Sequence, residues 1–346
     1  MRCRPSVTEL PQVPRYFEEY SLSILLFDKE RRVSASKFGT IQVNALRHCH
    51  HLLCFELSLP VFKMKLCFSF FALWAATTAL ARPGGTGLQQ RMEQRLSSMH
   101  AAGSSAPAVP ANITSGPFPN TNGTASQYYT TNWAGAIITA PPTGSIFNIV
   151  IASFVVPIPE PPVSGTGVWW GTAWVGIDGF TYGNAILQTG IDWGVEVFAD
   201  GSKAYGYWGW YEWYPNGWSD FSFDVTGNDT IELVIEAPNT STGICAMSNQ
   251  RTGASVSTML TAPSNASVLM GQNAEWIVED FSSGGLVPFA NFGTVTFTGC
   301  TAEAGRTALA ISGTTASTVD IVNATTKVPI TNVVFPAVDQ VAITYI

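Results

Sequence analysis

The carboxyl-terminal two thirds of this 346-residue chain contain no histidine, because all four histidines lie before residue 101. A Ser-His-Asp triad, a Cys-His pair and most zinc sites need an imidazole, so residues 122–346 exclude these kinds of site. Any catalysis there must use carboxylates, amides, hydroxyls or backbone groups. We therefore expect no metal and no cofactor.

Basic charge is also scarce in this region. From residue 122 onward, four basic residues stand against seventeen Asp and Glu, which gives a formal net charge of −13. Such an acidic surface repels nucleic acids and anionic membranes, so we expect neither as a partner. An acidic environment suits this composition, because protonation of the carboxylates relieves their mutual repulsion.

A targeting signal is present, although it does not start at residue 1. The basic stretch Lys63-Met-Lys65 precedes apolar residues 66–80, and Ala79-Leu-Ala81 provides the small residues of a signal-peptidase site. We predict a signal peptide over residues 64–81 and a secreted, extracellular protein. Residues 1–63 have a foreign composition, and we interpret them as a disordered gene-model extension. A cytoplasmic tail on a signal anchor is the alternative.

Residues 82–123 form a segment of different character. Apolar residues recur at helical spacing from Leu88 to Met99, and Ser, Ala, Pro, Gly and Asn dominate after them. A short helix and a linker ahead of a secreted domain indicate a propeptide, which we expect to inhibit its own domain. We hypothesise that Arg91 and Arg95 pair with carboxylates of the site at neutral pH and that acid breaks these pairs. An ordinary disordered spacer is the alternative.

Residues 124–346 are long enough for one large domain, and we expect it to be a monomer. Short segments alternate apolar and polar residues, and Ile231–Glu236 follows a turn at Gly227-Asn-Asp229. No stretch keeps a period of 3.6 residues. The pattern predicts an all-β fold, an antiparallel two-sheet β-sandwich of the jelly-roll or concanavalin-like type.

Cysteines and glycosylation sequons fit a secreted protein. Cys245 and Cys300 are the two cysteines after residue 122, and in an oxidising compartment we predict a disulfide between them. Two free buried thiols are the alternative. The sequons, which we expect on the surface, lie at Asn112, Asn122, Asn228, Asn239, Asn265 and Asn323.

Carboxylates, one amide and large aromatics share strand faces in four segments. Residues i and i+2 of a strand point to the same side, which groups Trp174 with Asp178, Gln188 with Asp192, Trp210 with Glu212 and Tyr214, and Glu275 with Ile277, Glu279 and Phe281. Burying several carboxylates without cations is costly. We therefore expect a concave, wet cleft with aromatic walls for a polymer and carboxylates for proton transfer.

Five sequence blocks, in order, resemble those of the fungal glutamic peptidases, the eqolisins. They are Asn132–Ala136, Thr172–Asp178, Ala185–Gly190, Trp210–Pro215 and Asn273–Phe281. The resemblance implies a secreted, pepstatin-insensitive acid endopeptidase with Gln188 and Glu279 as its catalytic pair. It also implies a substrate cleft formed by Trp133, Trp174, Asp178, Asp192, Trp210, Glu212 and Tyr214, to which we add Phe281. Trp208 and Ser282 depart from the family pattern and affect the rim rather than the pair.

The chemistry of these side chains fits amide hydrolysis. Water must be activated, an oxyanion stabilised and the leaving amine protonated. We predict that the Glu279 carboxylate takes a proton from water and returns it to the amine, while the Gln188 amide, which does not titrate, donates to the oxyanion. A protonated Glu279 that acts first as an acid is the alternative order.

Two other readings remain open from the residues alone. Trp174 and Trp210 suit either the core or the cleft, and Asp178, Asp192 and Glu212 suit either structural hydrogen bonds or substrate contact. A secreted carbohydrate-active sandwich, whether a glycosidase using Glu212 and Glu279 or a lectin-like module, is the alternative function.

Overall fold

The structure, a computed structural model, describes residues 105–111 and 126–346, together with the backbone of three strands before residue 69. The chain divides into two units, Met1–Leu80 and Ala81–Ile346. Arg91 and Arg95 of the predicted propeptide lie outside the described residues. Within the part of the chain that the structure describes, no helix has the length and apolar character needed to cross a membrane.

The first unit contains a small antiparallel sheet. Strands β1 (Val43–Ala45), β2 (Leu53–Leu59) and β3 (Phe62–Phe68) pair in that order. Residues 55–59 of β2 alternate apolar and polar side chains, which is typical of a strand. Strand β3 overlaps the start of the predicted signal peptide, and the interpretation of residues 1–63 stays a prediction.

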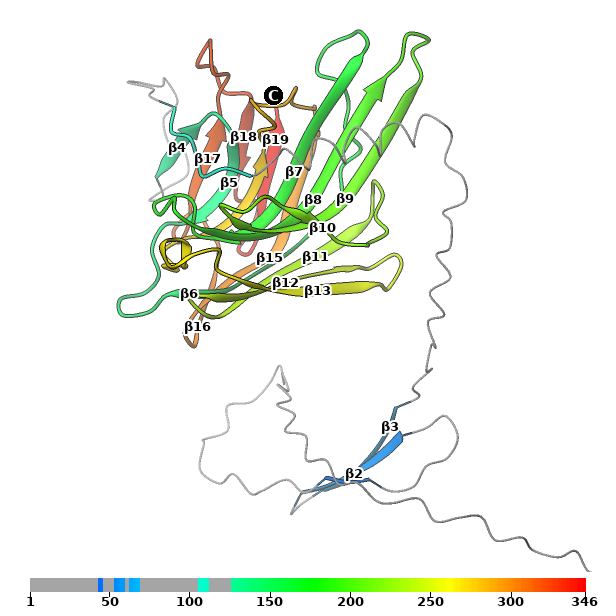
Figure 1. Cartoon of the computed structure of the whole chain (residues 1–346), viewed down its shortest axis with the longest axis vertical. Coiled ribbons are helices and arrows are strands. Elements are labelled where there is room, and N and C mark those ends of the chain that lie inside the picture. Colours follow the sequence, from blue (N-terminus) through cyan, green and yellow to red (C-terminus); the bar gives the residue numbers. More distant parts are fainter. Residues whose placement is uncertain (1–42, 46–52, 60–61, 69–104, 112–125) are drawn as a thin grey trace, which may run out of the picture. The chain divides into compact units, whose positions relative to one another are not determined.

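The second unit contains two large sheets that lie one over the other (Figure 1). The first sheet has the order β10-β9-β8-β7-β14-β5-β17-β4. Its strands are β4 (Gln127–Thr130), β5 (Trp133–Ile138), β7 (Gly167–Ile177), β8 (Ile186–Val197), β9 (Lys203–Tyr214), β10 (Ser219–Asp220), β14 (Ala274–Glu279) and β17 (Ser317–Ile321). Every pair is antiparallel except β17 and β4, which run parallel.

The second sheet has the order β13-β12-β11-β6-β15-β19-β18, with β16 paired to β15. Its strands are β6 (Phe147–Val155), β11 (Thr230–Asn239), β12 (Thr242–Asn249), β13 (Ser255–Thr261), β15 (Thr294–Ala304), β16 (Thr307–Ala310), β18 (Thr331–Val334) and β19 (Val341–Tyr345). A single turn of 3₁₀-helix, η1 (Asn265–Ser267), lies between β13 and β14. The predicted antiparallel two-sheet β-sandwich is confirmed.

The main hydrophobic core lies between the two sheets. Strand β12 alternates buried and partly exposed residues, so one of its faces packs inward. By contrast, β5 and β14 of the first sheet are buried at every position. The first sheet is therefore covered on both faces, and its second apolar cluster, on the side away from the core, includes Trp133, Trp174 and Trp210.

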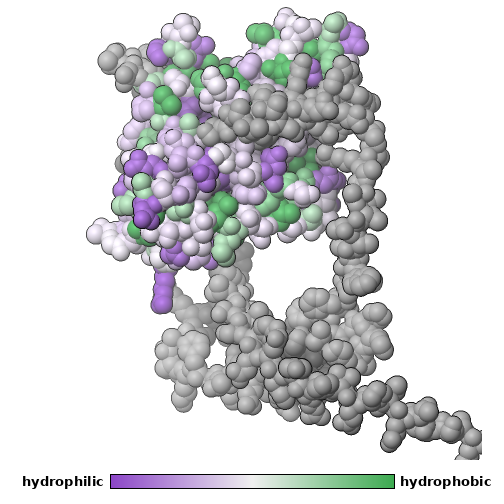
Figure 2. Space-filling model, viewed as in Figure 1, coloured by the Kyte–Doolittle hydropathy of each residue, from purple (hydrophilic) through white to green (hydrophobic). Residues whose placement is uncertain are grey.

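The surface of the second unit is mixed in polarity. Figure 2 shows hydrophilic and hydrophobic residues interspersed over its visible described face. The sequon asparagines at positions 228, 239, 265 and 323 are exposed, as the sequence predicts. Those at positions 112 and 122 lie outside the described residues.

The predicted disulfide between Cys245 and Cys300 is wrong, because both cysteines are free, buried thiols. Cys245 lies on β12 and Cys300 on β15, and the sheet order places β11 and β6 between those strands. Three strand spacings of about 4.8 Å separate the two positions, whereas a disulfide needs Cα atoms within about 7 Å. Counting cysteines could not reveal this separation.

Candidate active site

The predicted catalytic residues lie on the face of the first sheet that points away from the core. Leu187 and Val278 belong to the core between the sheets, so their neighbours Gln188 on β8 and Glu279 on β14 point to the opposite side. Strand β7 lies between β8 and β14, and its Gly176 pairs with Gln188. Both side chains are fully buried.

Aromatic side chains form the walls around this pair. Trp133 and Trp174 meet edge to face, with ring centroids 4.8 Å apart. Trp218 packs against Trp210 at 5.4 Å and against Phe281 at 5.0 Å. The two tryptophans whose location the sequence left open, Trp174 and Trp210, thus belong to the second apolar cluster rather than to the core between the sheets.

The Glu279 carboxyl group is fully buried and receives several hydrogen bonds. Trp174 Nε1 donates to Oε2 at 2.8 Å, and the hydroxyl of Ser105 donates to the same oxygen. The backbone N–H of Ala106 donates to Oε1 at 3.4 Å. Burial raises the pKa of Glu279 to about 7, although these hydrogen bonds act to lower it. In this covered state the raised pKa favours the protonated form of Glu279 at acid pH.

Gln188 is held by a second carboxyl group. Its Nε2 donates to Glu212 Oε2 on the neighbouring strand at 2.7 Å, and the two residues stand directly opposite in the β8–β9 register. Burial, and then the charge of Glu279, raise the pKa of Glu212 well above its ordinary value, against the hydrogen bond from Gln188. Since Nε2 carries two hydrogens, one remains available to a substrate oxygen.

Two further buried acidic residues, Asp192 and Asp280, lie close enough to Glu279 to interact with its charge. Asp192 is fully buried, and burial raises its pKa well above the ordinary value. Burial and then the charge of Glu279 raise the pKa of Asp280 to about 8. The described cations Lys203 and Arg251 pair with Glu160 and Asp229, which do not belong to this group. Lys203 and Arg251 therefore do not form ion pairs with these carboxyl groups, and burial favours their protonated forms.

Asp178 has a structural role, which is one of the two roles that the sequence allowed. Its Oδ2 accepts from the backbone N–H of Met270 at 2.7 Å and of Gly271 at 2.9 Å. Its Oδ1 accepts from Gln272 N at 2.7 Å and from Asn273 N at 3.4 Å. The carboxylate thus holds the loop that leads into β14, and contact of Asp178 with substrate stays a prediction.

Residues 105–111 occupy the face that carries Gln188 and Glu279, which sequence reasoning did not anticipate. Ser105 is fully buried, its hydroxyl contacts Glu279, and its backbone N–H contacts Glu212. One residue therefore spans the space between the two carboxyl groups. The segment then continues beside β4 (Figure 1), where Pro110 forms an isolated antiparallel bridge with Thr130. The segment is Ser-Ala-Pro-Ala-Val-Pro-Ala, whose composition carries no pattern that predicts such docking.

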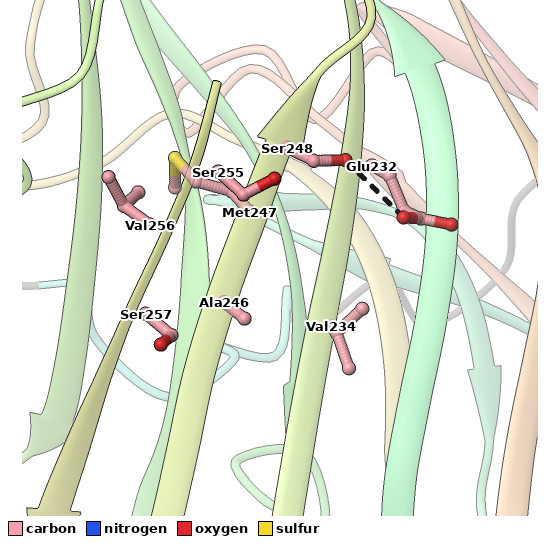
Figure 3. A pocket seen from close by; sticks show the side chains of 8 residues that line it. All are labelled: Glu232, Val234, Ala246, Met247, Ser248, Ser255, Val256 and Ser257. Atoms are coloured by element: carbon pink, nitrogen blue, oxygen red, sulfur yellow. Dashed lines mark hydrogen bonds between the residues drawn. The ribbon is translucent and has the colours of Figure 1, made fainter. Parts of the chain in front are cut away.

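Tyr214 is half-buried and packs against the aromatic cluster, on the face that the sequence predicted. A separate groove of about 330 Å³ lies on the second sheet, lined by strands β11, β12 and β13 (Figure 3). Within it Ser248 donates a hydrogen bond to Glu232, which is exposed. Among the described residues, no group of three or more His, Cys, Asp or Glu side chains could hold a metal ion.

Known proteins resemble this chain in sequence and in fold. The model of the Peptidase A4 family matches residues 131–345. Aspergillopepsin-2 of Aspergillus niger is 37% identical over 69% of this chain and 86% of its own length. Scytalidopepsin B of Scytalidium lignicola is 38% identical over 66% of this chain and 80% of its own length. The crystal structure of scytalido-glutamic peptidase with a peptide-based transition state analog matches at a TM-score of 0.51 and 33% identity, over 62% of this chain and 98% of that one.

Proposed function

Because this chain belongs to the Peptidase A4 family, the glutamic endopeptidases, we propose that it hydrolyses peptide bonds at low pH with Glu279 and Gln188. The observation that carries this proposal is the peptide segment at residues 105–111, which sits against Glu279 as a substrate would. The nitrogen of Ala106 lies 3.4 Å from Glu279 Oε1, where a leaving amine must receive its proton.

The reaction uses the two side chains in turn. The Glu279 carboxylate removes a proton from water while the hydroxide adds to the carbonyl carbon, and the Gln188 amide donates to the oxyanion that forms. Glu279 then returns the proton to the nitrogen as the C–N bond breaks, which leaves a carboxylic acid and an amine. The Ser105 hydroxyl occupies the position of the water on Glu279.

Glu212 and the aromatic walls prepare the site for this chemistry. The hydrogen bond from Gln188 Nε2 to Glu212 fixes which way the amide faces, so its second hydrogen points at the substrate. Departure of residues 105–111 admits water to Glu279, which weakens the burial that raises its pKa and moves the carboxyl group toward ionisation at acid pH.

The test is cleavage of an acid-denatured protein at about pH 3 with pepstatin present, conditions that suit carboxyl chemistry. The secreted natural chain is compared with Gln188→Ala and Glu279→Gln, and circular dichroism checks that each is folded. We expect pepstatin-resistant cleavage by the natural chain and its loss in both variants. Full activity of folded Glu279→Gln contradicts the assignment of the pair.

The segment at residues 105–111 supports the proposal that the propeptide inhibits its own domain. This part of the propeptide carries no charge, so its docking does not depend on ion pairs. Covering Glu279 raises its pKa, so protonation favours the docked state and acid alone does not release this segment. Release therefore requires cleavage of the chain, in addition to the loss of any ion pairs made by Arg91 and Arg95.

Inhibition by the segment can be measured with the synthetic peptide of residues 105–111. We expect competitive inhibition of the secreted enzyme and roughly fivefold weaker inhibition by the peptide that carries Ser105→Ala, because one hydrogen bond is lost. A peptide with Val109→Leu serves as a control, since its main-chain groups are unchanged. Equal inhibition by all three peptides contradicts the role of the Ser105 hydroxyl.

Secretion and glycosylation belong to the same proposal. The signal sequence at residues 64–81 and the exposed sequons at Asn228, Asn239, Asn265 and Asn323 support both. Mass spectrometry of the culture medium should find a protein that starts after residue 81 and carries glycans. The carbohydrate-active alternative loses its support, because the chain belongs to a peptidase family.

A further inference from the structure

The docked segment makes a set of main-chain hydrogen bonds on one side of the Ser105–Ala106 peptide bond. If Ala106 N marks the leaving amine, then residues 106–109 lie where the leaving half of a substrate lies. On this side, Trp133 Nε1 donates to the carbonyl of Ala106 at 3.1 Å. The carbonyl of Gly179 accepts the N–H of Ala108 at 3.3 Å.

Asn132, the residue before β5, makes the largest number of these contacts. Its Oδ1 accepts the N–H of Val109 at 2.9 Å. Its Nδ2 donates to the carbonyls of Ala106 at 3.4 Å and Pro107 at 3.3 Å. One amide side chain therefore binds both a donor and acceptors of the same extended chain, which matches the donor and acceptor groups of a peptide backbone.

Two features indicate that this arrangement serves substrates as well as the segment. The bonds go only to main-chain atoms, which every peptide carries, so they do not depend on the Ala-Pro-Ala-Val sequence. Asn132 is only 2% exposed, and among the described residues the hydrogen bonds of its side chain all go to residues 106–109. A buried amide of this kind loses its partners when the segment leaves, so a peptide that replaces them gains binding energy.

We propose that Asn132 is a positioning residue that holds the main chain of the substrate on the leaving-group side of the cleaved bond. This inference rests on the proposed function and deepens it, since it predicts preference for peptides that extend several residues beyond the cut. Asn132 contacts neither Gln188 nor Glu279 through any hydrogen bond described, and it acts through the substrate backbone.

The test uses peptides that share one amino half and carry one, two, three or four residues of the series Ala-Pro-Ala-Val after the cut bond. The natural secreted protein is compared with Asn132→Ala, and mass spectrometry verifies that each peptide is cut at the same bond. For the natural protein we expect kcat/KM to rise with the length of the leaving half. In Asn132→Ala we expect a loss of roughly 10- to 50-fold for the four-residue peptide and a much smaller loss for the one-residue peptide, because the hydrogen bonds are made along the chain.

A structural role of Asn132 is separated from this one by two readouts. The loss should appear mainly in KM and should grow with peptide length, whereas a distorted site lowers kcat for every peptide alike. Asn148→Ala on β6, where Asn148 accepts a hydrogen bond from Gly305, is the matched control and should keep the length dependence.

The outcomes of this test are distinct. An equal loss at all lengths in a folded Asn132→Ala protein, or no loss at any length, overturns the role of Asn132 while leaving the peptidase intact. If the natural protein cleaves neither the peptides nor an acid-denatured protein, the proposed function itself is overturned, and this inference with it.

Discussion

Burial of Glu279 predicts that the folded protein is more stable in acid than at neutral pH. The folded protein holds a proton on Glu279 up to a pKa of about 7, whereas the unfolded chain releases it near the ordinary value of 4.5. The resulting stabilisation is fully present below about pH 4.5 and is lost as the pH rises through about 7. Unfolding is therefore expected to become easier across this window.

The magnitude follows from the size of the shift. A rise from 4.5 to about 7 corresponds to about 3 kcal/mol at roughly 1.4 kcal/mol for each pH unit. Glu279→Gln replaces the carboxyl group by a neutral amide of the same size, so this contribution no longer titrates. The variant should lie close to its parent at about pH 4 and be about 3 kcal/mol more stable at about pH 7.5.

Urea unfolding of the full chain at several pH values measures this difference. Both proteins carry Gln188→Ala, so that the proposed peptidase activity does not digest them in acid. Glu236→Gln in the same background reports the effect of replacing a glutamate at an exposed position of β11. A constant difference between the Glu279→Gln protein and its parent from about pH 4 to about pH 7.5 refutes the reasoning, because Glu279 would then not hold its proton through burial.

Three further predictions concern other parts of the second unit. Asp178→Asn keeps the shape of the side chain but weakens its hydrogen bonds to the N–H groups of residues 270–273, so it should lower the free energy of unfolding by about 3 kcal/mol. Thermal unfolding measures this loss, and Asp200→Asn at an exposed turn is the control. Alkylation of the denatured protein without reductant should label both Cys245 and Cys300, and unlabelled cysteines would contradict the free thiols. Glu212→Leu should lower the kcat of acid proteolysis about 100-fold, because the Gln188 amide loses its orientation. Glu212→Gln should lower kcat about tenfold or less, and equal effects of the two substitutions would contradict this role of Glu212.

Much of the site follows from the period of a strand and from the family blocks. Alternation alone places Gln188, Glu212 and Glu279 on the faces that the structure assigns to them, because side chains of a strand point to opposite sides in turn. Alternation does not reveal that this face is also buried. The first sheet is covered on both sides, so the expectation of a wet cleft does not hold for the covered state.

Other features depend on contacts that the sequence does not express. Asp178 binds backbone N–H groups more than ninety residues away, and no side-chain pattern records them. Ser105 lies 174 residues before Glu279 in a segment rich in Ala and Pro. The two cysteines could be counted, but their separation depends on the order of strands in the second sheet.

The docking of residues 105–111, with its bridge between Pro110 and Thr130, bears on how the proposed inhibition would end. While the chain is intact, the short connection through residues 112–125 keeps the segment near its site at an effective concentration on the order of millimolar. A segment with an intrinsic dissociation constant of that order would be half docked, and one that binds a hundredfold more tightly would be almost wholly docked. One cut within residues 112–125 turns it into a separate peptide whose occupancy falls with dilution. If the proposed inhibition and secretion hold, inhibition that is strong before secretion would therefore weaken on dilution, without any change in the contacts themselves.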